Sequence, residues 1–176
     1  MKILAISGSA RRNSTNTTML RVVSTMAPEA VSISVFDQIG GLPVFSPDLE
    51  AGELPPPVRD LMDQVAASDG LIISSPEYVR SIPGGLKNAI DWLVSSHLLA
   101  EKPMVLMHAS YRGEEMLEAL RTVLHTVSSR FSDDLFLRFS LMPLTPDQIS
   151  EELSTSENCH RIKLFLESFA HLCRTG

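Results

Sequence analysis

The stretch KILAISGSARRNSTN, residues 2–16, decides the fold. Its apolar run, Lys2–Ile6, is continuous, as expected for a strand of a parallel sheet that is covered on both faces. A polar loop follows, and a helix is predicted from about Asn16, because apolar residues then recur at helical spacing. The apolar face of this helix consists of Met19, Val23 and Met26. A buried strand that leads through a polar loop into a helix is the opening unit of an α/β fold.

The same alternation continues along the chain. Short apolar runs, which predict strands, are separated by segments with apolar residues at helical spacing. Pro55-Pro56-Pro57 opens one of these predicted helices, at a position where a missing N–H costs little. Five strands that alternate with helices predict a single domain, residues 1–176, with a parallel sheet, right-handed crossovers and helices on both faces. The four further strands are expected at Val31–Phe36, Leu71–Ser74, Pro103–Met107 and Leu135–Leu144.

Composition limits the classes of function. A formal net charge of -6 over 176 residues argues against a general nucleic-acid binder, which needs a basic face. No apolar run approaches the roughly 20 residues that span a bilayer, so no membrane partner is expected. The first apolar run is shorter than the about 7–15 residues of a signal peptide, so a cytoplasmic location is expected. Cys159 and Cys173 form no C-x-x-C pair and predict no metal site. They are expected to be unpaired thiols on a C-terminal helix, and the alternative for Cys173 is a redox thiol.

Two loops are expected to carry the chemistry. Ligands of open parallel sheets bind outside the carboxyl ends of the strands where the strand order reverses, which for the order 2-1-3-4-5 lies between strands one and three. The loop at 7–16 runs into a helix N-terminus, whose free N–H groups and dipole favour an anion. Its Ser9, Ser14 and Asn16 can add hydrogen bonds, and Arg11 can neutralise a phosphate.

The loop at 7–16 differs from two common phosphate-binding loops. It contains neither G-x-x-x-x-G-K-[ST] nor G-x-G-x-x-G, so it is not an ATP-type P-loop or a dinucleotide fingerprint. It indicates a phosphate cradle, and the alternative is an ordinary turn with a helix N-cap. In the second loop, 75–81, prolines and following glycines can hold an open backbone against a planar ligand, with Tyr78 as an aromatic face. An ordinary strand-to-helix connection is the alternative there.

Three segments of the chain form a recognisable set. They are Gly8-Ser9-x-Arg11-x-x-Ser14-x-Asn16, Pro43-x-Phe45-x-x-Asp48-Leu49-Glu50, and Ser75-Pro76-Glu77-Tyr78 with Ser81-x-Pro83-Gly84-x-Leu86-Lys87-Asn88-Ala89-Ile90-Asp91-Trp92. With these segments the chain resembles the NADPH-dependent FMN reductase family, and the third segment, which is long and unusual, is the specific signal. The resemblance covers Lys2 to about Trp92 well and continues more loosely beyond. It implies a flavodoxin-like α/β fold, a three-layer sandwich with a five-stranded parallel sheet of order 2-1-3-4-5.

The resemblance implies FMN as the cofactor. The first loop would hold its phosphate, and the second would line the isoalloxazine ring, largely through backbone groups. Val79 stands where the family often has asparagine. The loop after strand four, usually glycine-rich in the family, here runs from His108 to Gly113, and Ser110 is its best candidate contact. The predicted cofactor-binding residues are Ser9, Arg11, Ser14, Thr15, Asn16, Pro76, Glu77, Tyr78, Val79 and Ser110.

The implied activity is that of an NAD(P)H-dependent oxidoreductase. NADPH or NADH would pass a hydride to flavin N5, and free flavin, a quinone, a nitro- or azo-compound or an oxidised metal ion would take the electrons. No catalytic side chain is expected. His108 could polarise an acceptor, although a structural histidine is more common there. Arg80 could meet a nicotinamide nucleotide phosphate, although a solvated arginine is more common. The family works as a homodimer or a dimer of dimers, so helix Leu86–Trp92 is expected at an interface, with Lys87, Asn88, Asp91 and Trp92 structural.

Two other classes of function stay open from the sequence. A non-enzymatic FMN-binding redox sensor or electron carrier would keep the phosphate cradle without steady-state NAD(P)H oxidation. An electron carrier usually has a strongly acidic rim, and a charge of -6 is modest. A transferase or hydrolase acting on nucleotide phosphates would need an acid–base pair, and Glu77 is the only clear carboxylate at the strand ends.

Overall fold

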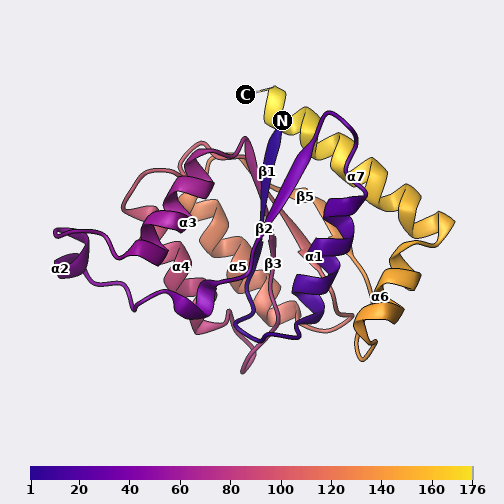
Figure 1. Ribbon diagram of the computed structural model, residues 1–176, viewed down its shortest axis with the longest axis horizontal. Helices are drawn as coiled ribbons and strands as arrows, with labels where there is room; N and C mark the ends of the chain where they lie inside the picture. The colour runs from indigo at the N-terminus through magenta and orange to yellow at the C-terminus, as the bar shows by residue number, and fades with distance from the viewer. Residues whose placement is uncertain (176) are drawn as a thin grey trace.

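The computed structural model describes residues 1–175, and its centre is one parallel sheet with the order β2-β1-β3-β4-β5 (Figure 1). This confirms the predicted strand order. The strands are β1 (Lys2–Ser7), β2 (Ser32–Phe36), β3 (Gly70–Ser74), β4 (Met104–His108) and β5 (Phe131–Arg138). The helices are α1 (Thr15–Thr25), η1 (Ile39–Gly41), α2 (Pro47–Glu50), α3 (Pro56–Ala66), α4 (Gly84–Val94), α5 (Glu114–Val127), α6 (Pro146–Leu153) and α7 (Ser156–Arg174).

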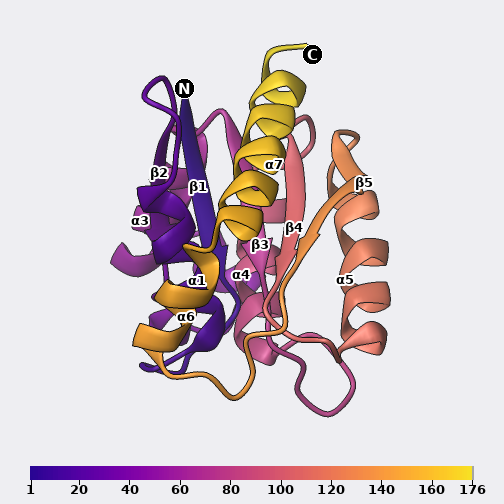
Figure 2. The same cartoon turned by 90° about the vertical axis from the view of Figure 1, so that its right-hand side faces the viewer.

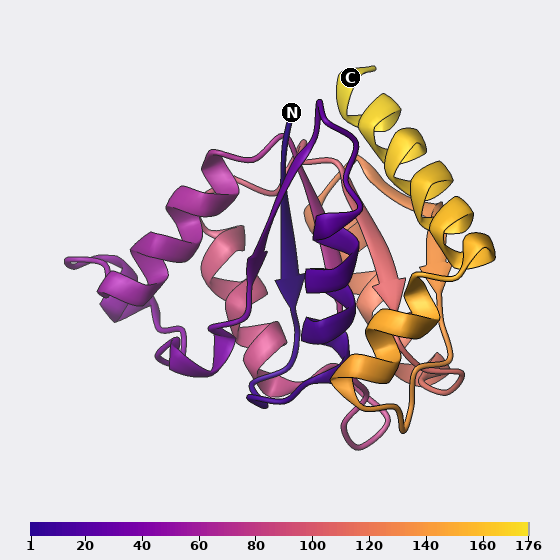
Figure 3. The ribbon, with the colours of Figure 1, turned by 45° about the vertical axis from the view of Figure 1, so that its right-hand side comes forward.

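Helices cover both faces of the sheet. Helices α1, α6 and α7 lie on one side, and α3, α4 and α5 lie on the other (Figure 3). Successive strand side chains point to opposite faces. In β1, Leu4 and Ile6 belong to one apolar cluster, whereas Ile3 and Ala5 belong to the other. Burial on both sides is the reason that residues 3–6 of this strand are all apolar, rather than only every second one.

The carboxyl ends of the strands share one edge of the sheet. β1 pairs in parallel with both neighbours, so that Ile3 faces Ile33 of β2 and Gly70 of β3. The strands run away from the end of the molecule where the two termini lie (Figure 2). The loops that follow β1, β3 and β4 therefore meet at the opposite end, where the sequence predicts a ligand site.

The fifth strand was predicted at Leu135–Leu144, and that range is wrong. β5 begins at Phe131 and ends at Arg138, and Asp133 and Asp134 within it are exposed. These carboxylates are tolerated because β5 is an edge strand, which charged residues protect from pairing with other chains. Beyond Arg138 the backbone N–H groups of Phe139 and Leu141 still donate to residues at the end of β4, at 2.9 and 3.2 Å, without forming strand. The buried apolar residues Leu137, Phe139 and Leu141 lie along the end of β5 and this extended segment, which explains the apolar pattern within residues 135–144.

None of the helices in residues 1–175 has the length and apolar character that crossing a bilayer requires. The same residues contain no group of three histidine, cysteine or acidic side chains placed to hold a metal ion.

Both cysteines are free and lie on α7, half-buried. Cys173 is expected to react slowly with iodoacetamide, because burial raises the pKa of its thiol from 9.0 to about 11. Its thiolate fraction at neutral pH is then about 100-fold below that of an ordinary thiol. The measurement is the alkylation rate by mass spectrometry in a Cys159→Ser variant, with the urea-unfolded protein as control. Equal rates in the folded and unfolded states would contradict the assignment and favour a reactive redox thiol.

Candidate functional site

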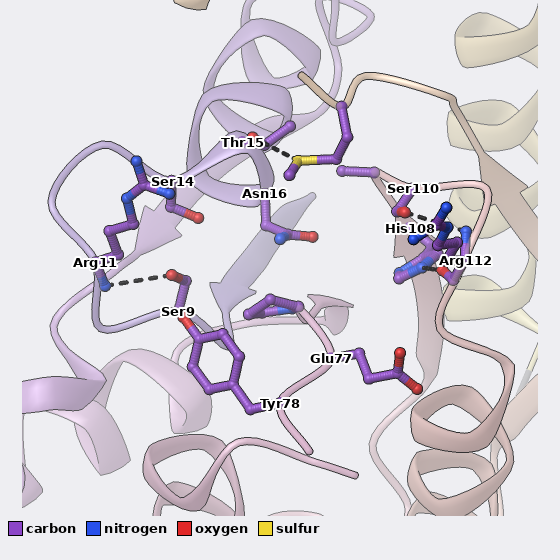
Figure 4. A pocket seen from close by; sticks show the side chains of 13 residues that line it. Ser9, Arg11, Ser14, Thr15, Asn16, Glu77, Tyr78, His108, Ser110 and Arg112 are labelled. Carbon is purple, nitrogen blue, oxygen red and sulfur yellow. Dashed lines mark hydrogen bonds between the residues drawn. The ribbon is translucent and has the colours of Figure 1, made fainter. Parts of the chain in front are cut away.

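A pocket of about 270 Å³ opens at the carboxyl edge of the sheet (Figure 4). It collects residues from the loops after β1, β3 and β4 and one residue from the segment after β5. Nine of the ten predicted cofactor-binding residues line it: Ser9, Arg11, Ser14, Thr15, Asn16, Pro76, Glu77, Tyr78 and Ser110. Val79 does not. Four further lining residues were not among those predicted to bind the cofactor: His108, Ala109, Arg112 and Met142.

The loop after β1 makes one end of the pocket. The Gly8 N–H donates to the Ser74 carbonyl at 2.7 Å, which holds the loop against β3. A Cβ on Gly8 would lie 2.8 Å from both Ser75 Oγ and Leu86 Cδ2, so only glycine allows this approach. Further along, the Ser9 hydroxyl accepts from the Arg11 N–H at 3.2 Å. These two hydrogen bonds fix the shape of the loop, and Ser9, Arg11 and Ser14 of this loop line the pocket.

Helix α1 begins at this loop. Ser14 is its N-cap and accepts from the Thr17 N–H at 3.4 Å. The first turn of α1 carries no acidic side chain, so nothing on the helix neutralises the positive end of its dipole. The side chain of Arg11 is exposed beside it. This end of the pocket has the electrostatics of an anion site.

Two buried hydrogen bonds attach α1 to the sheet. The Ser74 hydroxyl donates to Asn16 Oδ1 at 2.8 Å, and the hydroxyls of Ser7 and Thr17 lie 2.7 Å apart. Since the Asn16 carbonyl oxygen is used by Ser74, its amide N–H₂ is the part that remains to donate to a ligand. Figure 4 places Asn16 centrally in the pocket.

The loop after β3 forms a tight turn. Tyr78 and Ser81 exchange two backbone hydrogen bonds of 3.2 and 3.0 Å, and the two residues between them have φ values of 51° for Val79 and 59° for Arg80. Two successive left-handed residues are the mark of a type I′ turn. This turn points the Val79 side chain into solvent, where it is 98% exposed, and so keeps it out of the pocket. Arg80 forms an exposed ion pair with Glu115 at 3.0 Å.

Val79→Gly is expected to stabilise the protein by about 1 kcal/mol. The left-handed conformation costs a side chain about 1–2 kcal/mol, whereas glycine adopts it freely and loses part of that gain through its more flexible unfolded state. Urea unfolding followed by circular dichroism measures the change. The control is Leu164→Gly, because Leu164 is 49% exposed on α7 and has no positive φ, so the glycine should lower stability there. A loss of stability in both variants would contradict the strain argument.

The loop after β4 makes the other end of the pocket. Ser110 lines it, and its hydroxyl accepts from the Arg112 N–H at 3.1 Å. His108 is 2% exposed, and its Nε2 lies 2.6 Å from the Arg112 carbonyl. Burial lowers the pKa of His108 below 6.5. A buried, hydrogen-bonded histidine matches the structural role expected from the sequence.

Met142 comes from the segment after β5. The Thr15 hydroxyl donates to Met142 Sδ at 3.3 Å, which brings this distant segment over the start of α1. No sequence pattern marks Met142 as a site residue, because its position depends on how the chain turns between β5 and α6.

Helix α4 organises the neighbouring loop at 43–45. Asn88 accepts from the Phe45 N–H at 2.7 Å, and both Asn88 Nδ2 and Trp92 Nε1 donate to the Pro43 carbonyl, at 2.9 and 2.8 Å. Lys87 pairs with Asp91 at 2.5 Å on the outer surface of the helix. These contacts are structural, as expected for this helix.

The chain matches the model of the NADPH-dependent FMN reductase family over residues 1–135. It is similar to a quinone reductase of Escherichia coli, 34% identical over 113 residues, which cover 62% of this chain and 60% of that protein. It is also similar to a 2-hydroxy-1,4-benzoquinone reductase of a Burkholderia species, 44% identical over 92 residues that cover 52% and 49% of the two chains. The matched region thus spans less than two thirds of these relatives.

Two solved structures superpose on nearly the whole length of this chain. The flavoenzyme NAD(P)H:(acceptor) oxidoreductase of Paracoccus denitrificans superposes with a TM-score of 0.75 at 25% identity, covering 98% of this chain and 96% of that one. An archaeal flavodoxin, at 12% identity and a TM-score of 0.60, shares the fold. The long match to the family model, together with the strand order and the pocket position, shows that this chain belongs to the NADPH-dependent FMN reductase family.

Proposed function

We propose that this protein holds FMN in the pocket and works as an NAD(P)H-dependent oxidoreductase that reduces a quinone or another small acceptor. The observation that carries the proposal is the anion site at the start of α1, which opens directly onto the Pro76–Tyr78 segment. Bound FMN would supply hydride acceptance and release at its N5 atom, while the protein supplies binding and orientation.

The residues present fit the phosphate of FMN. Ser9, Ser14, Thr15 and Asn16 offer hydroxyl and amide donors, and Arg11 offers a guanidinium that can make a forked contact. They surround a helix start that lacks acidic side chains. An anion of charge near -2 would bind there without meeting a carboxylate of the same loop.

The side of the pocket formed by the loop after β3 fits the ring. Tyr78 is 49% exposed and can present an aromatic face to a flat ligand. Glu77 Oε1 is buried and has no hydrogen-bond partner among residues 1–175. A ligand N–H could donate to this oxygen. Such a bond would remove the free-energy penalty of a buried acceptor without a partner. Glu77 is the only carboxylate in the described pocket lining, and His108, the histidine there, is buried with its Nε2 bonded to the Arg112 carbonyl. This arrangement gives little support to a hydrolase or transferase, which would need a freely placed acid–base pair.

We further propose a homodimer or homotetramer assembled around α4. Val94 at the end of α4 is 43% exposed, and Val44, in the loop that Asn88 and Trp92 attach to α4, is 80% exposed. Exposed apolar side chains around one helix favour a protein interface. Light scattering on the wild type and on Val44→Asp measures the molar mass, and the charge of the variant should weaken the assembly. A monomeric wild type would contradict the proposed assembly. The cytoplasmic location stays a prediction from the sequence.

The deciding experiment combines a spectrum with turnover. The protein titrated with FMN should show a shifted flavin absorbance with saturation, and the loaded protein should oxidise NADPH or NADH in the presence of a benzoquinone. Flavin binding without turnover would favour the redox sensor or electron carrier, and no flavin binding would reject the proposal. Comparing NADPH with NADH at equal concentrations determines the preferred donor.

A further inference from the structure

One hydrogen bond links the outer part of the β4–α5 loop to the end of β4. His108 Nε2 lies 2.6 Å from the carbonyl oxygen of Arg112. Because a carbonyl can only accept, Nε2 must carry the hydrogen. The ring is 2% exposed, so this bond is shielded from water. The bond joins two residues four positions apart and so closes the segment from His108 to Arg112 into a hydrogen-bonded ring.

The other ring nitrogen, Nδ1, is buried and makes no hydrogen bond to a group among residues 1–175. The Ser75 carbonyl nevertheless acts to raise the pKa of the ring. Burial disfavours the charged ring, and Arg138 acts in the same direction. The carbonyls of Arg112 and Ser75 and the Glu114 carboxylate oppose it without outweighing burial. The neutral tautomer with hydrogen on Nε2 is therefore the form that these contacts select.

The two halves of the loop are held differently. The first half, Ala109 and Ser110, is held by the end of β5 and the segment that follows it. The Leu141 N–H donates to the Ala109 carbonyl at 3.2 Å, and Arg138 Nε donates to the Ser110 carbonyl at 2.6 Å. The Arg112 carbonyl, within residues 1–175, is held by His108 alone, and the Tyr111 and Arg112 side chains are exposed. The Arg112 N–H also donates to Ser110 Oγ at 3.1 Å within the loop, so the histidine supplies the bond that joins the Arg112 half to a strand.

Gly113 shows how tightly the loop closes on the ring. Its φ is +108°, and a Cβ there would lie 2.9 Å from His108 Nε2. The same Cβ position is 3.8 Å from Glu77 Cβ. Gly113 therefore packs closely against the histidine and near Glu77, whose Oε1 is the buried unpaired acceptor of the pocket.

We propose that His108 is a positioning residue whose Nε2–H fixes the Arg112 half of the β4–α5 loop as a preformed wall of the pocket. In the family this loop is usually glycine-rich, whereas this chain orders a bulkier loop by clamping it from the end of the strand. A wall that is ordered before binding lowers the entropy lost on binding. The part of this inference that concerns FMN rests on the proposed function, but the clamp itself is a property of the ligand-free protein.

A matched pair of variants tests the clamp. In His108→Gln the side-chain amide nitrogen can reach the position of Nε2 and donate to Arg112, whereas in His108→Asn the amide is too short to do so. The first readout is limited trypsin digestion without FMN, following cleavage of the Arg112–Gly113 bond by mass spectrometry. Cleavage after Arg12, on a different loop, is the internal reference. We expect cleavage at Arg112 at least 10-fold faster in His108→Asn and within twofold of wild type in His108→Gln.

The second readout is the Kd for FMN, measured by quenching of flavin fluorescence. We expect it to rise about 10-fold in His108→Asn and to stay within twofold of wild type in His108→Gln. Equal trypsin cleavage in the two variants would overturn the clamp. Different cleavage with equal Kd values would overturn its role in shaping the flavin site. If no form binds FMN but cleavage differs, the proposed function fails while the clamp stands.

A measurement on the wild type covers the case in which a variant does not fold. Nitrogen-15 NMR of the His108 ring in the ligand-free protein reports which nitrogen carries the hydrogen. We expect hydrogen on Nε2 and a bare Nδ1 throughout pH 7 to 8, where exposed histidines exchange between tautomers. Hydrogen on Nδ1, or a mixture of tautomers, would overturn the proposal.

Discussion

Arg11→Ala is expected to raise the Kd for FMN by about 10- to 100-fold, because a hydrogen bond to a charged group contributes about 1.5–3 kcal/mol. Arg11 lines the pocket beside the start of α1. The first turn of α1 has no acidic side chain that could pair with the guanidinium in place of a phosphate. Its loss removes one positive charge and a forked pair of donors from the phosphate. Titration of FMN fluorescence at constant ionic strength measures the change.

Arg12→Ala is the matched control for Arg11. Arg12 is the next residue, is also exposed, and does not line the pocket. Its removal changes the net charge by the same amount and should raise the Kd by less than threefold. Similar effects of the two substitutions would mean that general charge, rather than the geometry of this loop, attracts the phosphate.

Trp92→Ala is expected to lower the free energy of unfolding by about 3–5 kcal/mol, the usual range for truncating a buried large aromatic residue. Trp92 is 0% exposed, packs edge-on against Phe45 at a centroid distance of 5.1 Å, and donates to the Pro43 carbonyl. The substitution leaves a cavity and releases the loop at 43–45. Such a loss is a large part of the stability of an ordinary domain.

Urea unfolding followed by circular dichroism measures the effect of Trp92→Ala, since the variant loses the only tryptophan and its fluorescence. Leu164→Ala is the control, because Leu164 is 49% exposed on α7 and its truncation should cost less than about 1 kcal/mol. A Trp92→Ala variant as stable as Leu164→Ala would show that the packing around α4 can close the cavity.

The sequence predicted the sheet because its central strands are buried on both faces. β1 and β3 read as short continuous apolar runs, and their neighbouring loops carry the polar residues of the pocket. β5 was misplaced because an edge strand tolerates Asp133 and Asp134, which remove the apolar signal from its first half.

The site residues also fall into those that the sequence predicts and those that it does not. Residues that follow directly from a strand end, such as Ser9 and Pro76, were predicted, because the topology fixes their place. Val79 was placed in the pocket from its position in the sequence, but the two left-handed residues of the turn direct its side chain outward. Met142 was missed because it reaches Thr15 across 127 positions of sequence, and no local pattern encodes that contact.

The hydrogen bond from Ser74 to Asn16 has a consequence for how the protein responds to its cofactor supply. It joins a central strand to the helix that would hold the phosphate, and both partners are buried. Because this bond ties the proposed phosphate site to the centre of the sheet, FMN bound there would stabilise the folded domain by linkage. At a free FMN concentration of 100 times the Kd this linkage is worth about 2.7 kcal/mol. The abundance of folded protein in a cell would then follow the availability of flavin.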